Sequence, residues 1–205
     1  MINTNFAYQS APGESVNNIY DFLMELDKLK TVTRRAYIFD LSRNENSAEH
    51  CWHLALAILT LKEELNVEID LVKTLKMALI HDICEIGAGD ISIYDPQRSK
   101  KEIEERKYMN QLSGASVKIA SEIMELWEEY EEQSSKESQW VKVADRLLPF
   151  MMNLNTQGKA WKEQGVRKSQ VLQINQVTAK LAPKVYQWML TQIETAVERK
   201  WLIDS

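Results

Sequence analysis

Four side chains that can bind a metal ion or transfer a proton lie within ten positions of one another, between His81 and Asp90. His81 and Asp82 end an apolar run, Glu85 follows, and Asp90 comes after two glycines. An ionised aspartate in apolar surroundings is costly unless it is paired or coordinated. Few basic residues are near Asp82 in sequence, so a divalent cation would satisfy both His81 and Asp82. A set of hydrogen-bonded core polar groups is the alternative.

A metal site needs further ligands from other parts of the chain. His50 stands at the start of a second apolar helical pattern, and Asp145 stands inside a third one. Two neutral imidazoles and two carboxylates would carry a net charge of −2, which one divalent cation balances. Mixed nitrogen and oxygen ligands with open positions suit Mn, Co, Fe, Ni or Mg better than a closed structural Zn site, although Zn stays among the candidates. The chain has only three histidines, which favours one metal over a histidine-rich pair.

Glu85 and Asp90 are candidates for proton transfer beside that metal. Glu85 follows Asp82 by three residues and His81 by four, so a continuous helix would place all three on one face. Asp90 could fold back over the same site after the glycine turn, or it could serve only as a helix cap or turn residue. Two carboxylates next to a metal and a water molecule are suited to hydrolysis.

The elements that must position these residues are helices. Glycine and proline are few, and long segments carry a 3.6-residue apolar period without sustained alternation. The helix 70–86 is expected to end at Gly87 in the left-handed conformation. Residues 31–44 are expected to form a connection, and the acidic run 125–132 a solvated helix face. The expected helices span about 15–30, 47–64, 70–86, 99–112, 115–133, 135–155, 169–181 and 183–203.

Composition limits the possible partners. A net charge of −5 without a basic stripe argues against binding a nucleic-acid polymer. No run approaches the roughly 18 apolar residues of a membrane span, so no membrane partner is expected. The first residues lack a secretion-signal pattern, which predicts a cytoplasmic location. Cys51 and Cys84 lie in apolar helical patterns and are expected to be buried thiols in a reducing compartment.

The ordered set of His50, His81-Asp82 and Asp145 resembles the H…HD…D signature of the HD-domain metal-dependent phosphohydrolases. Residues 43–50, 81–90, 127–131 and 141–145 further resemble the 5′-deoxynucleotidase branch, and the similarity covers about residues 20–150. The resemblance implies an all-α HD-domain helical bundle with additional C-terminal helices. We expect a loose lead-in at 1–14, the helical core at 15–155, and a C-terminal extension at 156–205 packed on the same domain.

The family's residue roles carry over to matching positions. The resemblance implies one divalent metal ion held by His50, His81, Asp82 and Asp145, and it implies that Glu85 and Asp90 are the catalytic carboxylates. It also implies that an arginine upstream of the first histidine contacts the substrate phosphate, and Arg34 and Arg35 are both candidates. In the bacterial members a tryptophan follows that arginine, whereas Ala36 follows Arg35 here.

The expected activity is hydrolysis of a deoxyribonucleoside 5′-monophosphate, a small-molecule substrate, to deoxynucleoside and phosphate. One alternative is hydrolysis of another small phosphate ester or nucleotide at the same site. The other is a non-catalytic helical binding protein with a relict metal site. His53 lies one turn from His50 and is expected to be a core or supporting histidine. Several apolar helix faces favour a homodimer.

Overall fold

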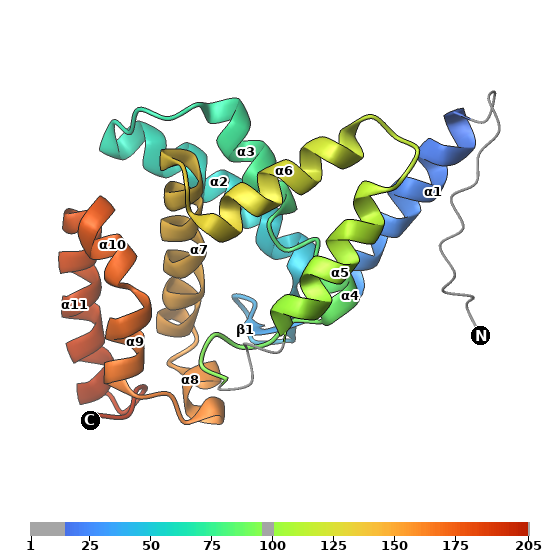
Figure 1. Ribbon diagram of the computed structural model, residues 1–205. Coiled ribbons are helices and arrows are strands. Elements are labelled where there is room, and N and C mark those ends of the chain that lie inside the picture. Colours follow the sequence, from blue (N-terminus) through green and yellow to red (C-terminus); the bar gives the residue numbers. More distant parts are fainter. Residues whose placement is uncertain (1–14, 96–100, 205) are drawn as a thin grey trace.

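Helices make up most of the structure, a computed structural model that describes residues 15–95 and 101–204 (Figure 1). The all-α expectation is confirmed, and the expected lead-in at 1–14 lies outside the described residues. The α-helices are α1 (Ser15–Asp27), α2 (Ser47–Leu65), α3 (Leu71–Ile80), α4 (Glu85–Ala88), α5 (Lys101–Ser113), α6 (Ile119–Glu132), α7 (Lys136–Asn155), α8 (Lys159–Gln164), α9 (Lys168–Ile174), α10 (Gln176–Leu181) and α11 (Pro183–Glu198). A short 3₁₀ helix, η1 (Lys28–Thr31), follows α1.

The main core joins the first seven helices. Side chains such as Leu54, Met77, Met109 and Val141 are completely removed from solvent, and they come from α2, α3, α5 and α7. A second cluster packs α7 against the C-terminal helices, which lie beside it in Figure 1. That cluster includes Leu147, Phe150, Trp161, Met189 and Ile193. Helix α7 therefore contributes apolar faces to both clusters, which fixes the helix that carries Asp145.

Capping residues set where the site-bearing helices begin. The Asn46 side chain accepts a hydrogen bond from the Glu49 backbone N–H at 2.9 Å, and the Glu49 carboxylate accepts one from the Asn46 N–H at 3.2 Å. This reciprocal capping box starts α2 and places His50 in its first turn. Ser135 and Ser138 form the same arrangement at the start of α7.

The prediction of one helix over 70–86 is wrong. Helix α3 ends at Ile80, residues 81–84 form turns, and the short α4 follows. Backbone bonds of the i→i−3 type, such as Glu85 N to Asp82 O at 3.0 Å, tighten this segment. The glycine with a positive φ in this segment is Gly89, at +73°, and not Gly87, which was expected to end the helix. Gly87 is needed for close packing, because a Cβ there would lie 2.6 Å from the Tyr108 Cβ.

A two-stranded antiparallel sheet spans residues 33–37 and 44–46, in and just after the connection predicted at 31–44. Strand β1 (Thr33–Tyr37) pairs with β2 (Asn44–Asn46), with Thr33 opposite Asn46 and an irregular register between the paired positions. Successive side chains of a strand point to opposite faces. In β1 the Arg34 side chain is 12% exposed and points inward, whereas Arg35 is exposed.

The C-terminal part also differs from the expected helices. Helix α8 was not predicted, the expected helix 169–181 is divided into α9 and α10 near Asn175, and α11 ends at Glu198. Asn175 is buried, and its side chain donates to the Val171 carbonyl at 2.8 Å, so it ends α9 from within the core. Short helices with polar junctions carry too little periodicity to be divided correctly from sequence.

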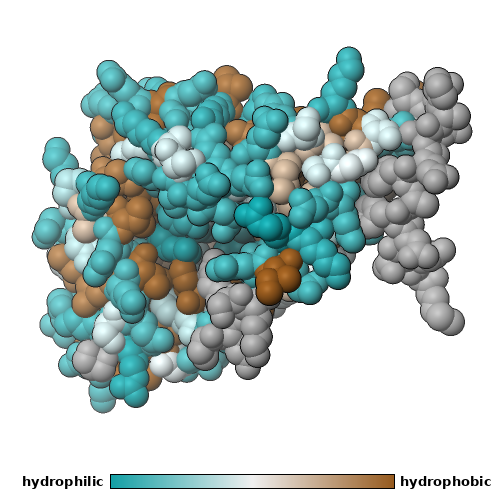
Figure 2. Space-filling view, in the orientation of Figure 1, coloured by the Kyte–Doolittle hydropathy of each residue, from teal (hydrophilic) through white to brown (hydrophobic). Residues whose placement is uncertain are grey.

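The face of the described residues that Figure 2 draws is mixed in hydropathy. On the face drawn in Figure 2 most exposed residues are hydrophilic, and the hydrophobic ones form separate patches. None of the helices in the described ranges combines the length and the hydrophobicity needed to cross a membrane.

Candidate functional site

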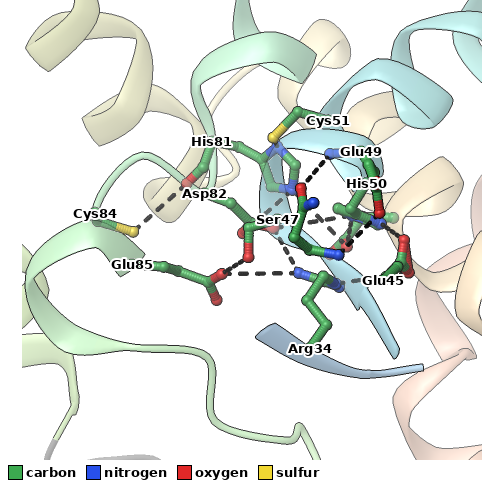
Figure 3. A network of polar contacts seen from close by, with 12 residues as sticks. Arg34, Glu45, Ser47, Glu49, His50, Cys51, His81, Asp82, Cys84 and Glu85 are labelled. Carbon is green, nitrogen blue, oxygen red and sulfur yellow. Dashed lines mark hydrogen bonds and ion pairs between the residues drawn. The ribbon is translucent and has the colours of Figure 1, made fainter. Parts of the chain in front are cut away.

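The structure brings all four predicted metal ligands together. His50 comes from α2, His81 and Asp82 from the turn after α3, and Asp145 from α7. The His50 Nε2 lies 3.2 Å from Asp145 Oδ1 and 3.9 Å from Asp82 Oδ2. The His81 Nε2 lies 3.3 Å from Asp82 Oδ1 and 3.9 Å from Asp145 Oδ1. Figure 3 shows both imidazoles turned toward this point.

The orientation of His81 fits a metal ligand. Its Nδ1 lies 2.9 Å from the Ala78 carbonyl and donates to it, which leaves Nε2 to face the acids. That Nε2 is fully buried and has no hydrogen-bond partner among the described residues. Ligand atoms of His50, His81 and Asp82 all lie within 4.8 Å of one another. A buried imidazole nitrogen beside two carboxylates matches the donor set of a divalent cation.

The pKa values of the four predicted metal ligands are shifted strongly from their ordinary values. Burial lowers the pKa of His50 to about 4, so its imidazole is neutral near pH 7, the form that binds metals. Burial opposes the charged form of His81, but the neighbouring Asp82 outweighs it and raises the pKa of His81. For Asp82, burial is outweighed by His81 and Arg34, which hold its pKa well below the usual range. A bound cation would replace the proton that the raised pKa keeps on His81.

Asp145 is held by two neighbours besides the histidines, Tyr130 and Arg146. Tyr130 donates from its hydroxyl to Asp145 Oδ2 at 3.0 Å, and Arg146 Nη1 lies 3.4 Å from the same oxygen. Burial alone would raise the pKa of Asp145, but Arg146 and the hydrogen bond to His50 keep it well below its ordinary value. The carboxylate is therefore charged and fixed in direction.

The two candidate arginines differ in position. Arg34 Nη1 lies 2.6 Å from Asp82 Oδ2 and 3.9 Å from Glu85 Oε2, and its Nε lies 3.8 Å from Glu45 Oε1. A pocket is lined by Arg34, His81, Asp82 and Asp145, and the exposed Arg35 is also part of its wall. Figure 3 shows Arg34 inside the cluster of carboxylates, whereas Arg35 lines the pocket from an exposed position.

Glu85 and Asp90 both line this pocket. Glu85 is buried; Ser47 Oγ donates to its Oε2 at 2.6 Å, and Lys101 Nζ donates to its Oε1 at 2.8 Å. Burial and the nearby Asp82 raise the pKa of Glu85 to about 7, against the opposing effect of Arg34 and Lys101. Asp90 is half-buried, after the left-handed Gly89.

Sequence reasoning missed several residues that contact the predicted site residues or their partners. Ser47 and Lys101 contact Glu85, Tyr130 contacts Asp145, and Lys142 donates to the Tyr130 hydroxyl at 2.9 Å. Tyr130 had a signal, because it lies in the 127–131 segment that resembles the nucleotidase branch. Lys101 had none, because it starts a highly charged segment that reads as a solvated helix.

The structure also places the acidic run 125–132 and His53. The acidic side chains of the run 125–132 are exposed or half-buried, as expected of a solvated helix face, whereas Leu126, Trp127 and Tyr130 are buried in the core. His53 is half-buried and lines a separate groove with Trp52 and Phe39, so the structure does not bring it to the ligand cluster.

Comparisons with known proteins agree with this geometry. A family model described as HD domain matches residues 26–186. The chain is 33% identical over 138 residues to 5′-deoxynucleotidase HDDC2 of Bos taurus, which covers 65% of each protein. It is 31% identical over 140 residues to the Homo sapiens protein of the same name, which covers 65% of this chain and 66% of that protein. The chain thus spans slightly less than two thirds of these relatives.

A solved structure is similar over nearly the whole chain. It is described as a predicted metal-dependent phosphohydrolase from Magnetospirillum magnetotacticum MS-1, with a TM-score of 0.86 and 33% identity. The match covers 95% of this chain and 98% of that one, so it includes the C-terminal helices.

Proposed function

The chain belongs to the HD-domain family, and from this premise we propose that it is a metal-dependent phosphohydrolase acting on deoxyribonucleoside 5′-monophosphates. The observation that carries the proposal is the convergence of two histidines and two aspartates, from three separate segments, beside a buried glutamate and an arginine. The relatives named 5′-deoxynucleotidase support the substrate class. The products are the deoxynucleoside and phosphate.

We assign His50, His81, Asp82 and Asp145 as the ligands of one divalent cation, with Mn, Co, Fe, Ni, Mg and Zn as candidates. When bound, the cation would supply Lewis-acid polarisation of a phosphate oxygen and increase the acidity of a water molecule. The buried, unpartnered Nε2 of His81 and the neutral His50 support this assignment.

The chain's own residues would hold the phosphate and move the protons. Arg34 presents planar N–H donors that suit phosphate oxygens, and we assign it in preference to Arg35, which is exposed. Glu85 accepts the proton of the attacking water, and a pKa of about 7 suits that exchange. The water oxygen forms the new bond to phosphorus as the bond to the 5′ oxygen breaks. Asp90 orients the water or protonates the leaving oxygen.

The test is phosphate release from a panel of ribonucleoside and deoxyribonucleoside monophosphates, with Mn²⁺, Co²⁺ or Mg²⁺ added, alongside elemental analysis of the purified protein. Turnover of deoxyribonucleoside monophosphates that a chelator abolishes is expected. Turnover of other phosphate esters alone would mean that the enzyme acts on a different class of substrate. Bound metal without any turnover would favour a non-catalytic binding protein.

We also propose that the protein forms a homodimer through the groove that contains Trp52. Phe39 is 83% exposed and Trp52 63%, and grouped exposed apolar side chains mark interaction surfaces more often than single ones do. Light scattering after size exclusion tests this, since Trp52→Ser should yield a monomer while Ile103→Ser, at a different exposed site, should not.

Two further expectations remain proposals. The two free, buried cysteines support a reducing compartment, and we propose a cytoplasmic location. The second core cluster, which joins α7 to Trp161 and Met189, supports residues 156–205 as an extension packed on the 15–155 core. Limited proteolysis tests the latter, because early removal of residues 156–205 from the folded protein would contradict it.

A further inference from the structure

Lys101 is buried, with 6% of its surface exposed, and it stands at the start of α5. Its Nζ lies 2.8 Å from Glu85 Oε1 and 2.9 Å from Glu105 Oε1. A buried ammonium is costly unless it is paired, and these two carboxylates outweigh the effect of burial and raise the pKa of Lys101. The side chain is therefore charged and bridges α5 to the segment that follows the His81-Asp82 pair.

One face of α5 holds the short helix α4 at two points. Lys101, Glu105 and Tyr108 are spaced i, i+4 and i+7, so they share that face. The Tyr108 ring lies directly against Gly87, where an added Cβ would be 2.6 Å from Tyr108 Cβ. Lys101 holds Glu85 in the same four-residue helix. The backbone and the carboxylate of α4 are thus fixed by α5 together.

Both oxygens of Glu85 are fixed by side chains from different helices. Ser47, the first residue of α2, donates to Oε2 at 2.6 Å, and Lys101 donates to Oε1. Oε2 is also the oxygen that lies 3.9 Å from Arg34 Nη1. The oxygen nearest the arginine therefore faces the ligand cluster, while Lys101 holds the opposite oxygen away from it.

We propose that Lys101 is a positioning residue for Glu85, and that Glu105 in turn holds the Lys101 ammonium in place. The inference rests on the proposed function, in which Glu85 accepts the proton of the attacking water. In this proposal the Lys101 ammonium acts through Glu85, because two of its N–H donors point to Glu85 and Glu105.

The experiment compares Lys101→Met, Lys101→Gln and Lys101→Arg in the metal-loaded protein, with Lys107→Met as the matched control. Lys107 lies on the same helix but is exposed and pairs only with Glu104 within the described residues. With the deoxyribonucleoside monophosphate that the wild type hydrolyses fastest, Met and Gln should lower kcat about 10- to 100-fold. KM and metal content of these variants should stay near the wild-type values, and the Lys101→Arg variant should retain part of the wild-type kcat.

Several outcomes would overturn the inference. An unchanged kcat in folded Met and Gln variants excludes positioning, and a raised KM with unchanged kcat makes Lys101 a phosphate-binding residue instead. A lower metal content in the Lys101 variants would show that Lys101 supports the metal ligands rather than Glu85. Absence of turnover by the wild type would overturn the proposed function and this inference together, whereas an active wild type with active Lys101 variants overturns only the latter.

Discussion

The side chains of the site are oriented through atoms that do not face the proposed metal. His81 is held through Nδ1 by the Ala78 carbonyl, and Asp145 through Oδ2 by Tyr130. These contacts fix the direction of Nε2 and Oδ1, the two atoms that face the centre. Preorganisation of this kind raises affinity because less ordering is needed on binding.

Asp82→Asn should abolish metal-dependent phosphate release and lower the metal content of the protein. The substitution keeps the side-chain volume but removes the charge that Arg34 and His81 face. Elemental analysis and an assay of phosphate release measure the two effects. Asp21→Asn, at an exposed position of α1, is the control. Full metal content together with full activity in Asp82→Asn would refute the ligand assignment.

Arg34→Lys should raise KM for the nucleotide about tenfold, since lysine keeps the charge but loses the planar pair of donors. Arg35→Lys makes the same change one residue along β1, at an exposed position, and should alter KM little. Steady-state kinetics of the two variants decide which arginine holds the phosphate. The reverse pattern would assign that role to Arg35.

At the scale of helices and strands, the site residues are positioned where regular helices end or begin and by a short strand. The end of α3 at Ile80 and the turns that follow direct His81 and Asp82 toward α2 and α7. The capping box at Asn46 fixes the start of α2, and strand β1 then places Arg34 against that start. Helix breaks and strand alternation together bring distant charged groups to one point.

Gly87→Ala should destabilise the protein by about 1–3 kcal/mol, because the new Cβ would meet the Tyr108 side chain. The clash should also displace α4 and lower activity. Gly114→Ala is the matched control, since its Cβ would lie 3.4 Å from the Gln111 carbonyl, an ordinary contact. Chemical denaturation and an activity assay measure the difference. Equal stability of the two variants would contradict the packing argument.

At the scale of the whole molecule the proposed metal links three segments that are distant in sequence. A ligand that binds only the folded state stabilises it, by about 2.7 kcal/mol when its concentration is 100 times Kd. Added Mn²⁺ should therefore raise the melting temperature of the chelator-treated protein, and Asp145→Asn should remove most of that rise. An equal rise in both proteins would mean that the cation binds elsewhere.

The sequence by itself predicted the all-α class and the positions of most helices, because long apolar periods depend on local spacing. It also pointed to His50, His81, Asp82 and Asp145, because charged groups inside apolar patterns need partners; their role as ligands remains a prediction. It could not predict the small sheet or the break after Ile80, since short elements have weak local signals.

Only the tertiary structure decided which arginine lies inside the site and what holds Glu85. Strand register turns Arg34 inward and Arg35 outward, and register depends on pairing with β2. Lys101 belongs to a charged segment whose partners are set by the packing of α5 on α4. Contacts between segments far apart in sequence arise from packing. The sequence therefore indicates which residues are reactive, whereas the fold determines which residues they contact.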